Sequence, residues 1–413
     1  MKKKLFYIAF ISLWGCVVSC NKESGDNPID AELAKPIELT LKQAERASLD
    51  NRFSFVMFQN VAKTNANTFF SPLSLNMALG MLYNGTTGDT RDEMAEVFGV
   101  TGFTDKEFNE YYRKMSEALQ DIDPLTEIQL ANSIWYLTGF PVKKPFLDVN
   151  QQYFDAQVKD LDFSDSKAAD IINNWCAEKT KDRITKIVNN PIPDEVVMYL
   201  INAVYFKSQW KFAFEKSQSR ESDFTLESGK KEKVTLMEQT ITLPYYADEH
   251  IQCVEMPYGN QAFSMVAILP QEGRTMEQLR DYLDNDTWKA ISGKFYQQNI
   301  YLKLPRFKIE CDLPLKEPVY DAGLKLIFSG GFNNISDKKL RVSEIKQKTF
   351  VEVNEEGTEA AAATVIGFEV TSVPPDQSAV PVPFFADRPF LYLIKEKSTG
   401  VILFIGRMDE PKE

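Results

Sequence analysis

The pattern of apolar and polar residues changes from helix-like in the first part of the chain to strand-like in the second. Apolar positions recur at helical spacing through residues 40–63. Ser71 and Pro72 form a cap-and-first-turn signature. Thr90 and Glu93 have the spacing of a capping box for a further helix. The helix predicted after Ser71 is marked by leucines at helical spacing: Leu75, Leu79 and Leu82.

Later segments have the patterns of strands. The run from Glu195 to Phe206 is largely apolar and rich in β-branched residues, which predicts a strand buried on both faces. Three further segments alternate or run apolar over strand lengths: 263–270, 300–309 and 390–408. Because helices dominate the first part of the chain and strands the rest, the order favours the α+β class.

Composition allows one large globular domain. The chain has 413 residues, 44% of them hydrophobic and 26% charged, without a repeat or a Gly/Ser linker. We therefore expect a single domain over residues 40–413. Residues 1–19 hold three of the 47 basic residues and no acid, so the remaining 44 basic residues face 59 acidic ones. This net charge of −15 argues against nucleic acid as a partner.

The first residues predict export and are not expected to belong to the fold. Residues 1–19 combine three lysines with an apolar run and resemble a secretion signal. The small residue before Cys20 is typical of a bacterial lipoprotein signal, in which that cysteine carries the lipid. A cut at Cys16, or a plain signal with two incidental cysteines, is the alternative. Residues 20–39 then have the composition of a polar tether, and Asn21 after the cysteine favours the outer membrane; display on its periplasmic face and on the cell surface both stay open.

The chain lacks the residue sets of common enzymes. Its only histidine is His250, so a nucleophilic site would need this residue as its base. No zinc-ligand spacing, phosphate-binding loop or dinucleotide motif is present, and we expect no cofactor and no metal. No pair among the 59 carboxylates stands out as a glycosidase pair. The cysteines after Cys20 are odd in number and far apart, so we expect buried thiols: Cys176, Cys253 and Cys311.

Seven segments resemble, in order, the signature blocks of the serpin family, from about Thr40 to Met408. The resemblance implies one large domain of three β-sheets and eight or nine helices, with an exposed reactive loop at about residues 355–383. It also implies a monomeric inhibitor, not an enzyme, that traps target endopeptidases as a covalent acyl complex. The segments are NTFFSPLSLNMAL, YNGTTGDTRDEM, INAVYFKSQWKFAF, MPYGN, LPRFKI, VEVNEEGTEAAAAT and FFADRPFLYLIKEKSTGVILFIGRM.

The stretch EEGTEAAAAT at residues 355–364 is among the most specific of these. Alone, its alanines would predict a short helix. In inhibitory serpins the reactive loop is cut by the protease and inserts into the largest sheet as an extra strand. Side chains of a strand point alternately to its two faces, so the residues that face the core must be uncharged at every second position. The alternate residues that start at Thr358 are uncharged, whereas the residues between them include Glu359 and Glu369. The resemblance therefore assigns an inhibitory hinge to Glu355, Glu356, Gly357, Thr358, Glu359, Ala360, Ala361, Ala362, Ala363 and Thr364.

The resemblance also carries over a polar group under the region where the sheet opens. Ser71, Ser74 and Asn202 match polar residues of the family there. Many relatives have a histidine ten residues before the hinge glycine, and this chain has Gln347 instead. A glutamine donates and accepts hydrogen bonds but does not titrate. Its effect on the opening of the sheet is therefore an open question.

Three residues match the point where the loop first inserts. Trp210 matches a tryptophan at the top of the sheet, and Glu355 and Arg306 match an acid–base pair beside it. Taken one at a time, each would be read as an ordinary core or surface residue. The surrounding motifs favour the functional interpretation.

Family spacing from the hinge glycine places the reactive bond between Thr371 and Ser372. The loop is longer than in many relatives, so Val370 and Ser372 stay as alternatives for the specificity residue. No lysine or arginine lies between Lys348 and Arg388, although a trypsin-like protease needs a cation at the cut. The small β-branched residues favour elastase-like or subtilisin-like proteases, and papain-like cysteine proteases are an alternative.

Two other functions stay open at this point. A non-inhibitory serpin, such as a carrier or chaperone, would tend to have charged, bulky or proline residues in the hinge, and this hinge has Thr358 and four alanines. A surface lipoprotein that binds glycans or host proteins would use the fold alone.

Surface display predicts that protease shaving of intact bacterial cells removes the protein. An immunoblot of shaved cells checks this, with lysed cells as the control for susceptibility. A protein that is digested only after lysis would contradict surface display.

Overall fold

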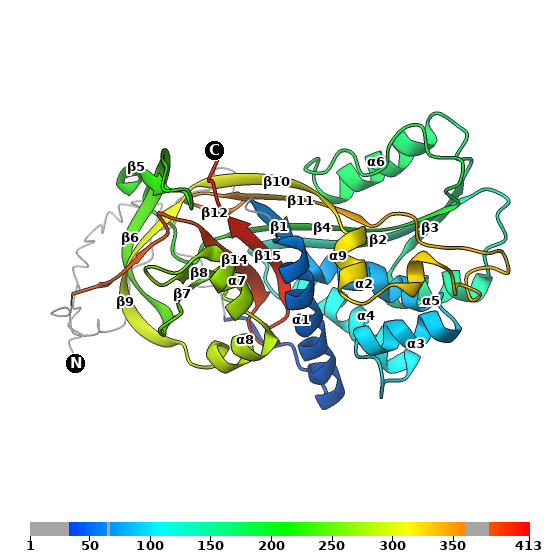
Figure 1. Cartoon of the computed structure of the whole chain (residues 1–413), viewed down its shortest axis with the longest axis horizontal. Helices are drawn as coiled ribbons and strands as arrows, with labels where there is room; N and C mark the ends of the chain where they lie inside the picture. Colours follow the sequence, from blue (N-terminus) through cyan, green and yellow to red (C-terminus); the bar gives the residue numbers. More distant parts are fainter. Residues whose placement is uncertain (1–32, 64–66, 360–379) are drawn as a thin grey trace, which may run out of the picture.

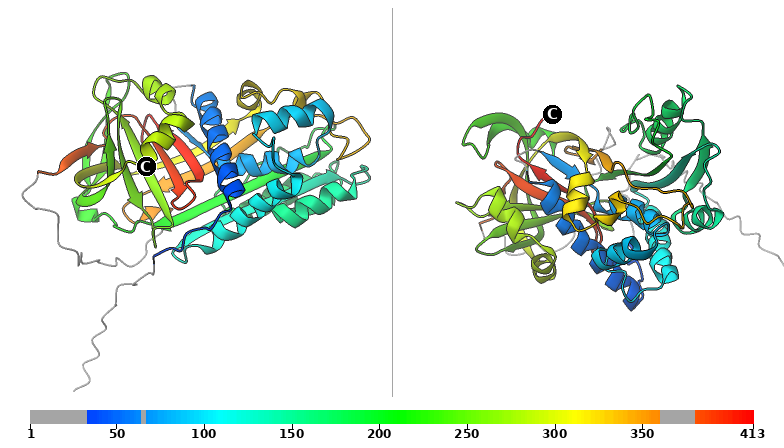
Figure 2. Two further views of the ribbon diagram at one scale, coloured as in Figure 1. Left: turned by 90° about the horizontal axis from the view of Figure 1, so that it is seen from below. Right: turned by 45° about the vertical axis from the view of Figure 1, so that its right-hand side comes forward.

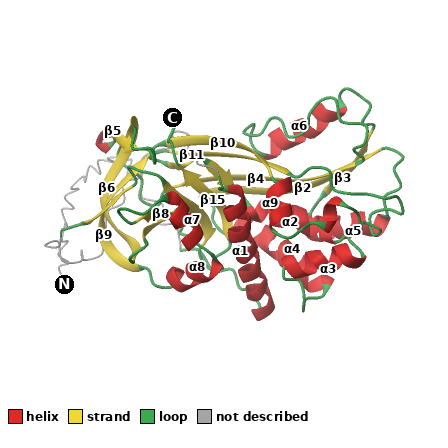
Figure 3. Ribbon diagram, viewed as in Figure 1, coloured by secondary structure: helices red, strands yellow, loops and turns green. Residues whose placement is uncertain are grey.

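The computed structural model describes residues 33–63, 67–359 and 380–413. These residues form helices and strands in the arrangement of Figures 1 and 3, and none of their helices is long and apolar enough to cross a membrane. The α-helices are α1 (Leu41–Val61), α2 (Pro72–Tyr83), α3 (Gly88–Val97), α4 (Asp105–Asp121), α5 (Lys144–Phe154), α6 (Ala168–Lys179), α7 (Met276–Tyr282), α8 (Asn285–Ser292) and α9 (Lys316–Asp321), with short 3-10 helices η1 (Lys216–Gln218) and η2 (Leu326–Phe328). The strands are β1 (Thr68–Phe70), β2 (Thr126–Leu137), β3 (Gln157–Leu161), β4 (Met198–Gln209), β5 (Arg220–Thr225), β6 (Lys231–Ala247), β7 (Ile251–Pro257), β8 (Phe263–Pro270), β9 (Tyr296–Pro305), β10 (Phe307–Pro314), β11 (Lys346–Val353), β12 (Gly357–Thr358), β13 (Val382–Phe385), β14 (Phe390–Glu396) and β15 (Ile402–Met408).

A six-stranded sheet runs along the longest axis of the molecule, in the order β10-β11-β12-β4-β2-β3 (Figures 1 and 2). The strand predicted at 195–206 is β4, which pairs antiparallel with β2 from Thr126 to Tyr136. On its other side lies β12, which in turn pairs antiparallel with β11. Within the described residues, β4 and β11 therefore do not pair with each other directly.

The second network of strands has nine members in the order β1-β15-β14-β8-β7-β6-β9-β13, with β5 beside β6. The long strand β6 joins its two parts. It pairs with β9 as far as Tyr245 and with β7 from Tyr245 onward. Counting these parts separately gives three sheets, so the described residues confirm the α+β class, the three sheets and the upper value of eight to nine helices.

Helices cover both faces of the six-stranded sheet (Figure 1). α2 and α4 contact β4 and β2 on one face, where the main apolar core also includes the inner strands of the nine-stranded network. α6 lies on the opposite face, and its apolar side chains form a second cluster with the sheet. β4 is therefore apolar on both sides because it lies between two cores. The second cluster includes Trp135, Ile172, Trp175, Cys176, Ile201 and Ala203.

The predicted start of α2 is confirmed. Ser71 is the N-cap, Pro72 occupies the first turn, and the Ser71 Oγ accepts the N–H of Ser74 at 3.2 Å. The cysteine prediction holds for Cys176 and Cys253, which are buried free thiols, whereas Cys311 is free but only half-buried.

The capping box predicted for Thr90 and Glu93 is wrong. α3 begins at Gly88, so Thr90 lies inside the helix and its hydroxyl donates to the Gly330 carbonyl at 3.0 Å. The Glu93 carboxylate accepts two backbone N–H groups of the segment 325–326, both at 2.7 Å. Both side chains therefore bind a segment more than 200 residues away, which local spacing does not show.

Residues 33–39, the described part of the predicted tether, lie against the domain. The Ala34 N–H donates to the Asn260 carbonyl at 3.2 Å, and the Ile37 N–H donates to the Ser398 hydroxyl at 2.9 Å. The apolar side chains of this segment pack against the main core. The contacts of the domain therefore begin before the predicted boundary, because three scattered apolar residues suffice to dock an extended segment.

Arg46 and Asp50 form a buried ion pair that ties α1 to α4. The two side chains lie one helical turn apart, and the Arg46 Nη2 is 2.9 Å from the Asp50 Oδ1. The Tyr112 hydroxyl of α4 donates to the same carboxylate at 3.0 Å, and the Arg46 Nη1 donates to the Gly99 carbonyl at 3.1 Å. Burial raises the pKa of Asp50, although the neighbouring guanidinium favours the ionised form.

Replacing Arg46→Ala should lower the apparent free energy of unfolding by about 3–5 kcal/mol, because it leaves a buried carboxylate without its cation. Urea denaturation of the two proteins measures the loss. The matched control is Lys106→Ala, which removes an exposed cation 3.6 Å from Glu110 and should produce no measurable change. Similar small losses in the two variants would contradict the role given to the buried pair.

Candidate functional site

The candidate site is the strand position between β11 and β4, at the end where β12 lies. Gly357 and Thr358 form β12 and pair with Gln209 and Ser208 of β4, and Thr358 also pairs with Val353 of β11. Of the segment predicted as a hinge, these two residues are thus already part of the six-stranded sheet. The predicted hinge residues Ala360 to Thr364 and the predicted reactive bond at Thr371 and Ser372 lie outside the described residues.

Gly357 is required by the close approach of two backbones. Its φ is +155°, and a Cβ atom built on it would lie 2.1 Å from the Ser208 carbonyl oxygen. Any side chain here would push the chain away from β4. The glycine therefore fixes where the segment enters the sheet.

The side chain of Thr358 faces the main core. The residue is 2% exposed, and its Oγ1 lies 2.5 Å from the hydroxyl oxygen of Tyr258. The Tyr258 ring stacks on Trp210, with 4.4 Å between ring centroids. Thr358, the first of the alternate residues predicted to face the core, therefore does face it. Tyr258 lies within the MPYGN block, and no sequence pattern gave it this role.

Trp210 holds the turn before β12. Its indole N–H donates to the Asn354 carbonyl at 2.9 Å, and its backbone N–H donates to the Glu356 carbonyl at 2.8 Å. The Asn354 side chain accepts the N–H groups of Glu356 and Gly357. The structure thus places Trp210 where the segment joins the sheet, as the resemblance implied.

Arg306 and Glu355 lie together beside this turn. The Arg306 Nη2 is 2.6 Å from the Glu355 Oε1, and the Ser219 hydroxyl donates to the same oxygen at 2.6 Å. Burial opposes ionisation of Glu355, but the hydrogen bonds from Arg306 and Ser219 outweigh it and hold its pKa below the ordinary value. Glu356, the next hinge residue, pairs with Lys216 at 2.5 Å. This part of the site is therefore anchored by the ionised carboxylate of Glu355.

The polar group under the sheet is only partly assembled as predicted. The Gln347 side chain accepts the Ser71 N–H and donates to the Ser71 carbonyl, both at 2.8 Å, which links β11 to the start of α2. Ser74 joins this group through the Ser71 hydroxyl. Asn202 instead donates to the Asn132 side chain on β2 at 2.7 Å. The neutral amide of Gln347 thus supplies both a donor and an acceptor at this point.

Glu359 is the least expected feature of the site. Its side chain is buried, and its Oε1 lies 3.5 Å from Nε of Arg183, in the turn after α6. Tyr205 of β4 also favours the ionised form of this carboxylate and so opposes the rise of its pKa. Burial raises the pKa of Glu359 to about 7, with Tyr205 and Arg183 opposing the rise. The alternating pattern placed Glu359 on the opposite face from Thr358, but it did not predict Arg183 as the partner of Glu359.

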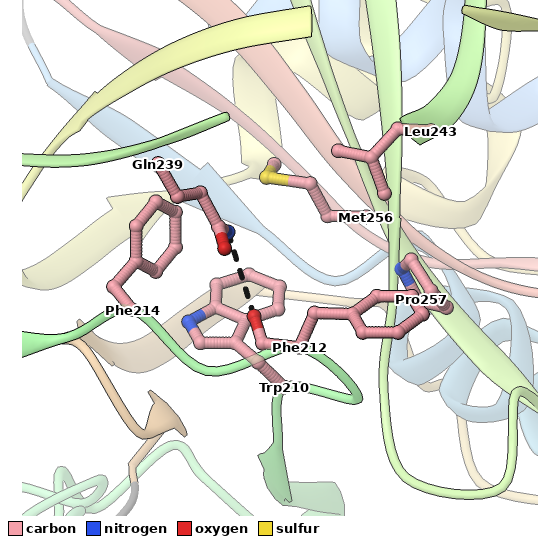
Figure 4. Close-up of a pocket in the computed structure, with 7 residues that line it drawn as sticks. All are labelled: Trp210, Phe212, Phe214, Gln239, Leu243, Met256 and Pro257. Atoms are coloured by element: carbon pink, nitrogen blue, oxygen red, sulfur yellow. Dashed lines mark hydrogen bonds between the residues drawn. The ribbon is translucent and has the colours of Figure 1, made fainter. Parts of the chain in front are cut away.

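The cavities near the site do not resemble a ligand-binding pocket. A space of about 10 Å³ lies against Trp210 (Figure 4), and it is no larger than one water molecule requires. Its lining is Trp210, Phe212, Phe214, Gln239, Leu243, Met256 and Pro257. A depression of about 390 Å³ beside Ser208 is lined by residues 120, 124–129 and 207–209, none of them aromatic. Ligand pockets are mostly lined by apolar and aromatic groups, so a carrier function gains little support.

No metal site was found within residues 33–63, 67–359 and 380–413. The His250 ring stacks on Tyr282, with 4.3 Å between the ring centroids, and the His250 backbone N–H donates to Asp248 at 2.7 Å. The site is therefore one of strand pairing and side-chain anchoring.

The fold and the site define a protein whose main sheet holds a partly formed strand at the start of a long segment. A family model described as Serpin (serine protease inhibitor) matches residues 48–411. An uncharacterised serpin-like protein of Thermococcus kodakarensis is 33% identical over 368 residues, which cover 88% of this chain and 85% of the relative. The chain belongs to the serpin family.

Solved structures agree with this family. The native state of tengpin, a thermophilic serpin, matches with a TM-score of 0.81 and 30% identity, over 92% of this chain and 97% of that one. Thyroxine-binding globulin in complex with thyroxine matches with a TM-score of 0.79 and 25% identity, over 89% of this chain and 100% of that one. The family thus includes a binding protein of the same fold.

Replacing Gln347→Leu should lower the apparent free energy of unfolding by about 1–3 kcal/mol, because the buried Ser71 N–H loses its acceptor and the Ser71 carbonyl keeps only the Leu75 N–H. Urea denaturation measures the change. The control on the same strand is Lys348→Ala, whose Nζ lies 2.9 Å from the partly exposed Asp312 carboxylate, and it should show no measurable loss. Equal stabilities of the parent and the leucine variant would contradict the importance of the Gln347 link.

Proposed function

We propose that this protein is a suicide-substrate inhibitor of serine endopeptidases that traps its target by strand insertion. The observation that carries the proposal is β12: the segment before the predicted reactive bond begins a strand between β11 and β4. Small residues follow it in the sequence, which suits a strand that slides between packed neighbours. The family to which the chain belongs supports inhibition in general.

In the proposed mechanism, the protease serine Oγ bonds to the carbonyl carbon of Thr371, and the Thr371–Ser372 peptide bond breaks. The amino end at Ser372 leaves, and the protease stays acyl-linked to Thr371. The freed segment then continues β12 as a full strand and carries the enzyme across the molecule. The movement distorts the oxyanion hole before water hydrolyses the acyl bond.

Strand pairing can supply the energy for this movement. A full strand would add roughly a dozen ladder hydrogen bonds, each contributing about 0.5–1.5 kcal/mol net. The uncut fold is then held by a kinetic barrier and is not at its free-energy minimum. The pairing of Gly357 and Thr358 with β4, and the bond from Trp210 to Asn354, support a start of such a strand at β12.

The residues at the proposed cut select the target class. Val370 and Thr371 are small and β-branched, and the chain has no cation between Lys348 and Arg388. A trypsin-like enzyme would leave the aspartate of its specificity pocket without a partner. We therefore expect elastase-like or subtilisin-like targets, with papain-like proteases reached through Val370.

The N-terminal motif completes the proposal. Cys20 follows a small residue and a basic, apolar leader, as in bacterial lipoproteins. A lipid on this cysteine would hold the inhibitor at the outer membrane, where it could meet proteases from outside the cell.

The first experiment mixes the protein with an elastase and, separately, with trypsin. We expect a covalent complex that survives a denaturing gel with elastase only, and a released C-terminal fragment that starts at Ser372 by mass spectrometry. Efficient trapping of trypsin through the loop would contradict the proposed target class. Cleavage by elastase without any complex would favour a non-inhibitory binding protein.

A matched pair of hinge variants tests the insertion step. Thr358→Arg places an unpaired cation at a buried position, which costs several kcal/mol, and it should be cleaved without trapping. Thr358→Val keeps a small, uncharged, β-branched residue and should still trap elastase. Both must keep the parent circular dichroism spectrum. Equal trapping by the two variants would contradict insertion.

A further inference from the structure

Backbone strain gathers where the hinge meets the turn after α6. Among the described residues, five other than glycine have a positive φ, and three of them lie here: Lys181 at 52°, Asp182 at 62° and Glu359 at 53°. Such conformations are sparsely populated for these residue types and persist only where surrounding contacts impose them. Both the turn and the hinge are thus held in shape by what they touch.

The contacts that impose these shapes join three strands. Arg183 lies 3.5 Å from the Glu359 carboxylate, and its guanidinium covers the ring of Phe350 on β11 at 4.7 Å. Tyr205 on β4 also favours the ionised form of this carboxylate. The turn pairs with β2 through Lys181 and Glu127, which lie 3.0 Å apart. Arg183 therefore contacts both the hinge residue Glu359 and β11.

Glu359 directly follows the last residue of β12. Its N–H donates to the Glu352 carbonyl of β11 at 2.7 Å, as in a strand. Its φ of 53° departs from the extended values that a continuing strand needs. Insertion beyond Thr358 requires this residue to adopt an extended conformation, which its ion pair with Arg183 opposes.

We infer that Arg183 is a positioning residue that holds Glu359 in its turned conformation and so sets how readily the loop inserts. The inference rests on the proposed function. Glu359 has to become extended before the strand can grow past it.

The charge of Glu359 makes its ion pair with Arg183 sensitive to pH. The groups that face it are Arg183 from the turn, Tyr205 from β4 and Glu352 from β11, and the last of these disfavours a second negative charge. Burial raises the pKa of Glu359 from 4.5 to about 7. Its contribution to stability is thus complete below about pH 4.5 and is lost as the pH rises through about 7. Arg183 limits this loss by pairing with the carboxylate.

The test compares the uncut parent with Arg183→Ala, Arg183→Lys and Glu359→Gln at pH 5 and pH 8. We expect Arg183→Ala to lower the unfolding temperature by several degrees at pH 8 and to have no effect at pH 5, where Glu359 is neutral. Arg183→Lys should restore the parent value. In the Glu359→Gln background, Arg183→Ala should have no effect at either pH. Lys186→Ala, which removes an exposed cation from the same segment, is the control and should match the parent.

A loss of the same size at both pH values would show that Arg183 acts only by packing on Phe350, and it would overturn the inference. No loss at pH 8 would overturn it as well.

The effect on insertion is measured by incubating the uncut protein at a raised temperature and following its capacity to trap elastase. A loop that inserts without being cut is no longer available to the protease, so this capacity falls. Arg183→Ala should lose this capacity several-fold faster than the parent at pH 8 and at the same rate at pH 5. Equal rates at pH 8 would overturn the inference and leave the proposed function intact. A parent that traps no protease would overturn the proposed function, and the unfolding temperatures would still test the contact between Arg183 and Glu359.

Discussion

The structure depends on the backbone hydrogen-bonding capacity of two facing strand edges. β4 and β11 lie in one sheet, and among the described residues β12 lies between them: Thr358 pairs with both strands and Gly357 with β4. Buried backbone donors and acceptors are costly when they lack a partner. A chain segment able to continue β12 would therefore gain energy along its length. The entry point of such a strand is fixed by Gly357, whose missing side chain lets the backbone approach Ser208.

Both polar and apolar contacts surround β12. Gln347 joins β11 to α2 by hydrogen bonds to the backbone of Ser71, and Arg306 pairs with Glu355 beside the turn. These polar links are directional, whereas interlocked apolar side chains resist a change of position. The main apolar core reaches β12 through Tyr258, and the second core lies on the other face of the sheet. In the proposed mechanism, an entering strand would have to extend both kinds of contact.

Charge has a different role on each side of β12. Glu355 has strong donors, so it remains ionised and anchors the turn. Glu359 lies four residues further along, under the turn after α6, where burial favours its neutral form. The same segment thus carries Glu355, whose pKa is lowered, and Glu359, whose pKa is raised to about 7. The difference follows from their donors, since an Arg306 hydrogen bond of 2.6 Å contrasts with an Arg183 contact of 3.5 Å.

Features that rest on neighbouring residues could be read from the sequence. The strand β4 and the Ser71 cap follow from periodicity and turn chemistry within a few positions. The family blocks added the sheets and the pairing of Arg306 with Glu355. Features that rest on distant segments could not be read in this way: Thr90 and Glu93 bind the 325–330 region, and Ala34 docks on Asn260. Arg183 and Glu359 are 176 positions apart in the numbering and meet only because the fold brings the turn after α6 next to the hinge. Local spacing encodes which element forms, but the partner of a buried polar group depends on which segments the packed core brings together.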